Sequence, residues 1–227
     1  MSDEKQRWEE FHKDRVAANY PRWPNEFMLK TIFGSYLKEP VRLPERAKVL
    51  DVGCGFGNNL LPFLDRGHEC SGVEITAAIA ELSQQLLADR GYTARIVEGG
   101  NRRLPFPDAE FDLLLSLNVL HYESTEPAIE AALREYARVL KPGGTLLLMT
   151  VGPRHEIYER ATPLGGHQYR IANYDFRNGE QYFYFDNTKY LERYLAPGFE
   201  RIEMGRSTEE LFTTTVDFLV SVARRRS

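Results

Sequence analysis

Cysteine is scarce in this chain of 227 residues, which contains only Cys54 and Cys70. Two widely separated cysteines form neither a disulfide framework nor the paired spacing of a zinc site. We therefore expect no metal centre, and we expect both thiols to be small packing residues.

Long apolar runs are also lacking, since no stretch approaches the roughly 18 residues of a membrane span. The first residues, Met1 to Lys5, do not begin a signal peptide, so we expect a cytoplasmic protein without a membrane partner. The net charge of -4 offers no excess of positive charge, which makes a nucleic-acid partner unfavourable. Length and the absence of repeats predict one domain over residues 1–227, as a monomer or homodimer.

What the chain does contain is a glycine loop between a strand and a helix. Residues 47–52 form a short apolar run typical of a buried parallel strand. Gly53, Gly55 and Gly57 follow, and an apolar helical pattern begins at Asn58. Glycines allow a tight turn and let a ligand lie against the backbone. This order predicts the start of a nucleotide-binding βαβ unit.

The spacing of the loop argues against a dinucleotide ligand. The dinucleotide pattern G-x-G-x-x-G requires its third glycine at position 58, where this chain has Asn58. The third glycine is Gly57, which gives D-x-G-x-G-x-G beginning at Asp51. Glu74 ends the next apolar strand, where its carboxylate can accept from the ribose hydroxyls of any adenosine ligand.

Three further segments extend the pattern. They read LPFPD at residues 104–108, FDLLLS at 111–116 and LKPGGT at 140–145. With the glycine loop, their order and spacing over about residues 48–150 resemble the class I (Rossmann-like) S-adenosylmethionine-dependent methyltransferases of the small-molecule type.

The alternation of apolar strands and helices over residues 47–151 predicts a doubly wound α/β fold with a mostly parallel sheet. The resemblance implies seven strands in the order 3-2-1-4-5-7-6. We expect a helical cap at residues 1–40, a cofactor-binding core at 45–152, an insertion or lid at 153–186, and completion of the sheet at 187–227. The last two strands are expected at 199–204 and 216–223.

The resemblance implies S-adenosylmethionine as cofactor and S-adenosylhomocysteine as product. The glycine loop is expected to hold the methionine end, Glu74 the ribose and Ile75 the adenine. The family's usual Gly-Asp pair after the third strand reads Gly99-Gly100 here, so Asn101 or the carbonyl of Arg102 is expected to replace the aspartate. The implied cofactor-binding residues are Asp51, Gly53, Cys54, Gly55, Gly57, Asn58, Glu74, Ile75, Gly100, Asn101, Arg102 and Asn118.

Two segments outside the core are expected to enclose an acceptor. An amphipathic helix at residues 4–19 ends before Pro21 and Pro24, and Asn25 caps a second helix. Both helices either cover the sheet or form a cap. Asn178-Gly179 predicts a type I′ hairpin in which Phe176 pairs with Gln181, serving as a lid, an exposed hairpin or a dimer contact. The expected substrate residues are Tyr20, Trp23, Tyr122, His167, Tyr182 and Tyr184.

His121 is the predicted general base, should the acceptor need to lose a proton, although a structural role for this histidine is an alternative. Because Asn118 is not followed by Pro-Pro-(Tyr/Phe), methylation of base amino groups by that route is disfavoured. The leading hypothesis is methyl transfer to a small molecule. The alternatives are methylation of RNA or protein and a cofactor-binding module without catalysis.

Overall fold

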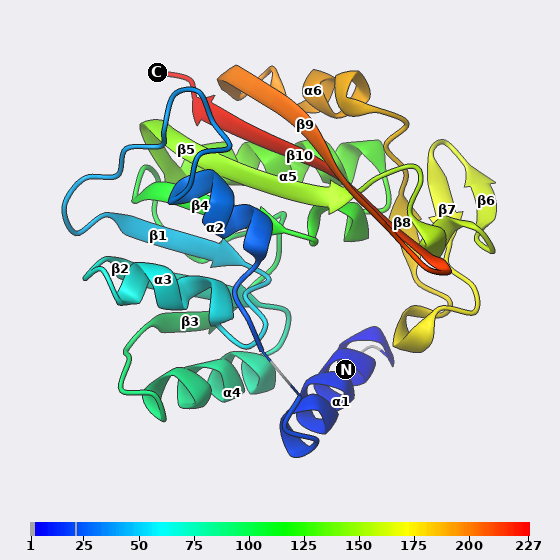
Figure 1. Cartoon of the computed structure of the whole chain (residues 1–227), viewed down its shortest axis with the longest axis horizontal. Helices are drawn as coiled ribbons and strands as arrows, with labels where there is room; N and C mark the ends of the chain where they lie inside the picture. Colours follow the sequence, from blue (N-terminus) through cyan, green and yellow to red (C-terminus); the bar gives the residue numbers. More distant parts are fainter. Residues whose placement is uncertain (1–2, 21) are drawn as a thin grey trace.

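The computed structural model describes residues 3–20 and 22–227, so the helix-ending role predicted for Pro21 lies outside the described residues. A seven-stranded sheet runs through the molecule (Figure 1). Its strands in spatial order are β3 (Arg95–Glu98), β2 (Glu69–Glu74), β1 (Lys48–Val52), β4 (Phe111–Leu117), β5 (Leu140–Val151), β10 (Thr214–Arg225) and β9 (Phe199–Leu211). The first five are parallel, whereas β10 is antiparallel to β5 and β9. The predicted strand order is confirmed.

Helices cover both faces of the sheet (Figure 1). One face carries α2 (Glu26–Ile32), α3 (Leu61–Leu64) and α4 (Ala77–Ala88), and the other carries α5 (Glu126–Val139) and α6 (Thr188–Leu195). Outside these layers, α1 (Asp3–Ala17) lies near α4 and the insertion. Short 3₁₀ turns are η1 (Asn58–Leu60), η2 (Leu120–Tyr122), η3 (Glu156–Tyr158) and η4 (Asp175–Arg177). In the described parts of the chain, no helix is long and apolar enough to cross a bilayer.

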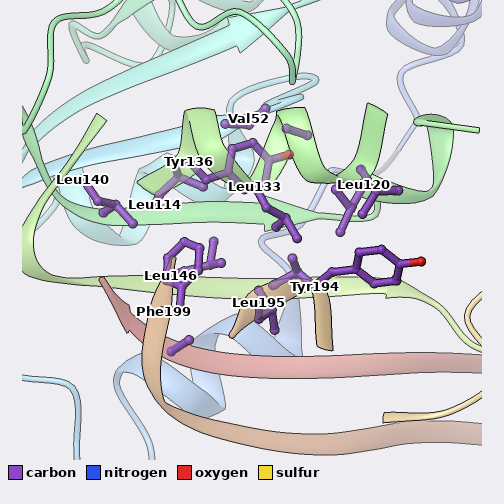
Figure 2. Close-up of a cluster of buried hydrophobic side chains, with 14 of the residues drawn as sticks. Val52, Leu114, Leu120, Leu133, Tyr136, Leu140, Leu146, Tyr194, Leu195 and Phe199 are labelled. Carbon is purple, nitrogen blue, oxygen red and sulfur yellow. The ribbon is translucent and has the colours of Figure 1, made fainter. Parts of the chain in front are cut away.

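Side-chain alternation divides the core into two halves. Successive strand residues point to opposite faces, so Leu114 packs with α5 and α6 whereas Leu113 and Leu115 pack with α2, α3 and α4. Figure 2 shows the first half, in which Tyr136 and Leu133 of α5 meet the sheet. Both layers are therefore needed to bury the sheet, as expected of a doubly wound fold.

Helix starts follow the capping residues of the sequence. The side chains of Asn25, Thr76, Thr125 and Asn187 each accept a hydrogen bond from a backbone N–H in the first turn of the following helix. The cap at Asn25 was predicted, and it places Met28 and Ile32 of α2 in the core. The second N-terminal helix therefore covers the sheet.

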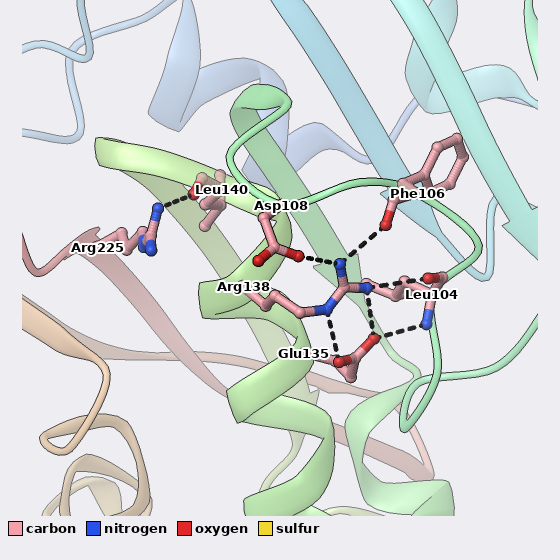
Figure 3. A network of polar contacts seen from close by, with 7 residues as sticks. All are labelled: Leu104, Phe106, Asp108, Glu135, Arg138, Leu140 and Arg225. Carbon is pink, nitrogen blue, oxygen red and sulfur yellow. Dashed lines mark hydrogen bonds and ion pairs between the residues drawn. The ribbon is translucent and has the colours of Figure 1, made fainter.

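The segment before β4 is fastened to α5 by one arginine (Figure 3). Arg138 donates to the carbonyl oxygens of Leu104 and Phe106 and to the carboxylate of Asp108, at 2.7–3.0 Å. Glu135 accepts from Arg138 and from the backbone N–H of Leu104. This network holds the LPFPD segment, and with it the preceding loop at the sheet edge.

The insertion between β5 and α6 has a different register from the one predicted. It forms a second sheet of β6 (Thr162–Gly165), β7 (Gln168–Arg170) and β8 (Gln181–Phe183), with Tyr169 opposite Tyr182. Asn178 has φ -55° and Gly179 has φ 92°, and the N–H of Glu180 donates to the carbonyl oxygen of Arg177. This is a type II turn, because type I′ requires positive φ at both central residues.

The pairing of Phe176 with Gln181 was therefore wrong. Residues 171–180 form a longer connection instead, and Phe176 packs on Phe11 of α1 with ring centroids 4.1 Å apart. The last two strands are also longer than expected, and only Phe212 and Thr213 separate β9 from β10.

Candidate active site

A cavity of about 660 Å³ lies at the carboxyl ends of the parallel strands. Val52, Glu74, Leu117 and Val151, the last residues of β1, β2, β4 and β5, all line it. Side chains of α1 and of the insertion close it from outside. The carboxyl edge of an open parallel sheet is where ligands bind in such folds, and the cavity volume suits a small-molecule site.

The cavity has two walls of different chemistry. The "glycine side" comprises Gly53, Gly55, Glu74, Ile75, Gly100, Asn101 and Arg102. The "aromatic side" comprises His121, Tyr122, His155, Tyr174, Arg177 and Tyr182. Asn118, after β4, lies between the two in the strand order.

The glycine loop adopts a backbone that only glycine accommodates easily. Gly53 has φ 68° and Gly55 has φ 56°. A Cβ on Gly53 would overlap the side chain of Val119. The loop therefore approaches the segment after β4 more closely than any side chain would permit.

Four of the predicted cofactor residues lie outside the cavity lining, which contains none of Asp51, Cys54, Gly57 and Asn58. Cys54 is a packing residue whose Sγ would lie 2.6 Å from a Cβ on Gly72. Asp51 is buried, and its Oδ2 accepts from Asn59 Nδ2 at 3.3 Å. Burial raises the pKa of Asp51 to about 8. These four residues therefore stabilise the loop from the side that faces away from the cavity.

Glu74 is the central acceptor of the glycine side. Its Oε1 accepts from the backbone N–H of Gly55 at 2.6 Å, and its Oε2 from that of Ile75 at 3.1 Å. Burial raises the pKa of Glu74, and the nearby His12 opposes that shift. The two backbone bonds fix the carboxylate orientation at the end of β2.

Asn101 connects the loop after β3 to the segment after β4. Its Nδ2 donates to Glu123 at 3.3 Å and to the carbonyl oxygen of Val119, and its Oδ1 accepts from the Tyr136 hydroxyl at 2.7 Å. Arg102 forms an ion pair with Glu123 at 3.0 Å. The amide of Asn101 is thus already engaged by protein groups.

Asn118 has φ 62°, a left-handed conformation that asparagine tolerates better than most residues. Its Oδ1 is buried without a hydrogen-bond partner among the described residues. A buried acceptor at a cavity wall is costly unless a ligand satisfies it.

His121 and Tyr122, two of the predicted site residues, lie in η2 shortly after β4 and line the aromatic side. The Nδ1 of His121 lies 3.2 Å from the Thr150 hydroxyl. Burial, together with the charge of Arg177, lowers the pKa of His121 well below its ordinary value. The imidazole is therefore neutral at physiological pH. Tyr182 of β8, also predicted, is fully buried and lies 4.5 Å from His121 between ring centroids.

Four other predicted substrate residues lie away from the cavity. Trp23 is 80% exposed, and Tyr20 packs under the Arg15 guanidinium on the outer surface. His167 stacks on Tyr190 at 4.5 Å, and Tyr184 packs against Tyr158 and Tyr169. None of these four lines the cavity.

Other lining residues were not predicted from the sequence. His155 caps the start of η3, and its Nδ1 accepts from the backbone N–H of Ile157 at 3.1 Å. Burial lowers the pKa of His155 to about 4. Arg177 donates through Nε to the Tyr122 hydroxyl at 3.3 Å and pairs through Nη1 with Asp175. The wrong hairpin register placed Arg177 at the turn of the hairpin, so this residue was not predicted to line the cavity.

One face of α1 closes the cavity. Glu4, Trp8 and His12 recur every four residues and all line it. Trp8 contacts Tyr122 at 5.5 Å and Phe176 at 4.7 Å between ring centroids. The helix is thereby joined to the insertion above the site.

Comparison with known proteins identifies this architecture. The family described as "Methyltransferase domain" matches residues 50–148. The chain is 34% identical to a putative methyltransferase of Encephalitozoon cuniculi over 170 residues, which are 72% of this chain and 75% of that protein. It is 33% identical over 115 residues to a sterol 4-C-methyltransferase of Caenorhabditis elegans, covering 50% of this chain and 34% of that protein.

Among solved structures, an S-adenosylmethionine-dependent methyltransferase of Methanosarcina mazei has a TM-score of 0.68 at 22% identity. The match covers 81% of this chain and 94% of that one and shows the shared fold. The chain spans only about a third of the sterol enzyme's length. Its fold, glycine loop and family match together show that it belongs to the class I S-adenosylmethionine-dependent methyltransferases.

Proposed function

We propose that this protein methylates a small-molecule acceptor held in the cavity between α1 and the insertion. The carrying observation is the contact of Phe176 with Trp8 and Phe11, which joins the two outer segments above the strand ends. An acceptor under this cover must be compact. The relative in Caenorhabditis elegans is named for a sterol, which is also a small molecule.

The glycine side fits the proposed cofactor. S-adenosylmethionine supplies a methyl group on a positively charged sulfur, beside hydroxyl and ammonium donors. Acceptors for them are the fixed carboxylate of Glu74 on this wall and the unpartnered buried oxygen of Asn118 next to it. Because the amide of Asn101 is engaged, the backbone carbonyl of Arg102 is the better partner for the adenine amino group.

Asp51, Cys54, Gly57 and Asn58 shape the loop rather than line the cavity. Asp51 in particular lies beneath it with Asn59.

The main contribution of the protein is to hold acceptor and donor in line. Such positioning supplies up to about 7–11 kcal/mol in oriented reactions. The rings of Trp8, Tyr122 and Tyr182 contact one another edge to face and form a continuous wall, which suits this purpose.

His121 contributes as a hydrogen-bond donor. In the described chain the Thr150 hydroxyl has only the Nδ1 of His121 as a side-chain partner. A buried hydroxyl hydrogen needs an acceptor, so the Thr150 hydroxyl donates to Nδ1. The remaining proton of the neutral ring is then on Nε2. This tautomer offers an N–H to the cavity, and the predicted general-base role would require the opposite tautomer.

The test uses methyl-labelled S-adenosylmethionine, the purified protein and a cell extract separated by filtration into small and large fractions. Label in a small product supports the proposal, and mass spectrometry of that product identifies the methylated atom. Label confined to RNA or protein refutes it, while leaving the fold and cofactor side unchanged. Cofactor binding without any label in either fraction favours a binding module.

A further inference from the structure

The aromatic side of the cavity is rich in hydrogen-bond donors and lacks a carboxylate. Its polar groups are two imidazoles, three phenols and one guanidinium. Of the lining carboxylates, Glu74 of the opposite wall accepts from the backbone, Glu123 pairs with Arg102 of that wall, and Glu4 is an exposed residue of α1. One wall therefore offers a carboxylate acceptor to a ligand, whereas the other offers hydrogen-bond donors and a positive charge.

Both histidines present an N–H. His155 accepts a backbone hydrogen bond at Nδ1, so its single proton is on Nε2 in the neutral form. His121 has the same tautomer, because Thr150 donates to its Nδ1. With pKa values lowered by burial, neither ring carries a charge at neutral pH.

Tyr182 is fully buried, and its hydroxyl lies beside that of Tyr122, with no other hydrogen-bond partner among the residues that the structure describes. A buried hydroxyl at a cavity wall costs roughly 1–3 kcal/mol if it stays unpaired. A ligand acceptor would remove that cost. The Tyr182 hydroxyl is therefore one further donor that this wall can offer to a ligand, beside the histidines.

Arg177 supplies the permanent positive charge of this wall. Nε donates to the Tyr122 hydroxyl and Nη1 pairs with Asp175, whereas Nη2 meets no acceptor within the described chain. Asp175 is 43% exposed, so water weakens its hold on the guanidinium. Among the other nearby carboxylates, Asp217 accepts from Arg154 and Thr208, whereas the buried Glu180 lies near Arg177 without a hydrogen bond among the described residues.

We propose that the acceptor is an organic acid that binds as its carboxylate anion to Arg177, Tyr182 and the Nε2–H groups of the two histidines. This inference rests on the proposed function, because it assigns the substrate class of the same cavity. Donors that converge on one anion form charge-assisted hydrogen bonds, which are stronger than neutral ones. An acid of this kind is already ionised at neutral pH, so methylation of its carboxylate would need no general base to remove a proton.

Two probes of the same shape test the charge preference. Binding of benzoate and of benzamide is measured by calorimetry with S-adenosylhomocysteine present. We expect wild type to bind benzoate at least 10-fold more tightly, and Arg177→Met to lose this preference by ~10–100-fold. Arg177→Lys should restore part of it. Arg170→Met, an exposed position in β7, is the matched control and should leave it unchanged.

Tyr182→Phe provides a second variant that removes one donor and keeps the ring packing. We expect benzoate affinity to fall ~3–10-fold, with benzamide less affected. S-adenosylhomocysteine affinity shows that each variant is folded. Equal binding of the two probes, failure of benzoate to bind wild type, or a benzoate preference that survives in folded Arg177→Met would overturn the inference.

A separate experiment distinguishes this inference from the proposed function. The small-molecule filtrate of a cell extract is passed over an anion-exchange resin before incubation with labelled S-adenosylmethionine. Acceptor activity in the retained fraction supports an acidic substrate. Acceptor activity only in the flow-through overturns the acid while the small-molecule function stands. No acceptor activity in the unfractionated filtrate, with label on macromolecules instead, refutes the proposed function itself.

Discussion

Glu180, directly before β8, makes the stability of the insertion depend on pH. Its side chain is 6% exposed, and neither carboxylate oxygen has a hydrogen-bond partner among the described residues. Burial, reinforced by the nearby charge of Glu4, raises its pKa from 4.5 to about 7 despite the opposing charges of Arg177 and Arg7. Above this pH the protein must hold a charge in a poorly hydrated place.

The sign of the effect follows from proton binding. Between pH 4.5 and about 7 the folded chain holds this proton more tightly than the unfolded chain does. Stability therefore falls as the pH rises through this window. A tenfold difference in proton affinity corresponds to about 1.4 kcal/mol. The rise of the Glu180 pKa from 4.5 to about 7 therefore limits the change in unfolding free energy to roughly 3 kcal/mol. Partial access of water reduces our expectation to about 1–2 kcal/mol.

Glu180→Gln replaces the carboxylate by a neutral group of the same shape. We expect this variant to match wild type in unfolding free energy near pH 4.5 and to exceed it by about 1–2 kcal/mol at pH 8. Urea unfolding at several pH values measures the difference, with the exposed Glu159→Gln as control for the change in net charge. A difference that does not change with pH would refute the reasoning.

Three further predictions concern the cavity walls. Glu74→Gln should weaken S-adenosylhomocysteine binding ~10–100-fold in calorimetry, because its amide group cannot accept both backbone N–H bonds; unchanged affinity would contradict this role. Gly53→Ala should lower both cofactor affinity and stability, because its Cβ would clash with Val119. The control Gly67→Ala has the same positive φ but open space for a Cβ, so its losses should be smaller. Equal losses of stability in unfolding experiments would exclude the clash. Phe176→Ala should lower the free energy of unfolding by only about 0.5–1.5 kcal/mol, because it removes ring contacts with Trp8 and Phe11. Amide hydrogen exchange should nevertheless become faster throughout α1. Unaltered exchange would show that the ring does not hold this helix in place.

The central sheet was predictable because several signals agree there. Residues 111–117 form a mostly apolar run, and β4 has these same bounds. The later strands were less predictable. Much of β9 and the beginning of β10 form a polar, two-sided ribbon beyond the buried sheet, so the alternation that marks a strand is missing.

The glycine side of the cavity followed from local motifs, whereas the aromatic side depends on tertiary contacts. Asn178-Gly179 fits both type I′ and type II turns, and only the packing of Phe176 on α1 distinguishes them. That choice determines whether Arg177 reaches the cavity. His155 and His12 likewise have no local pattern that marks them, because each enters the cavity wall through the placement of a whole segment.

The position of α1 has a consequence for the order of events during turnover. In the second half of the helix, His12 lies beside Phe56 of the glycine loop, and one turn earlier Trp8 lies against Tyr122. A single rigid element thus borders both compartments. A displacement of α1 would open both compartments at once, and it would then couple the residence times of the spent cofactor and the methylated molecule.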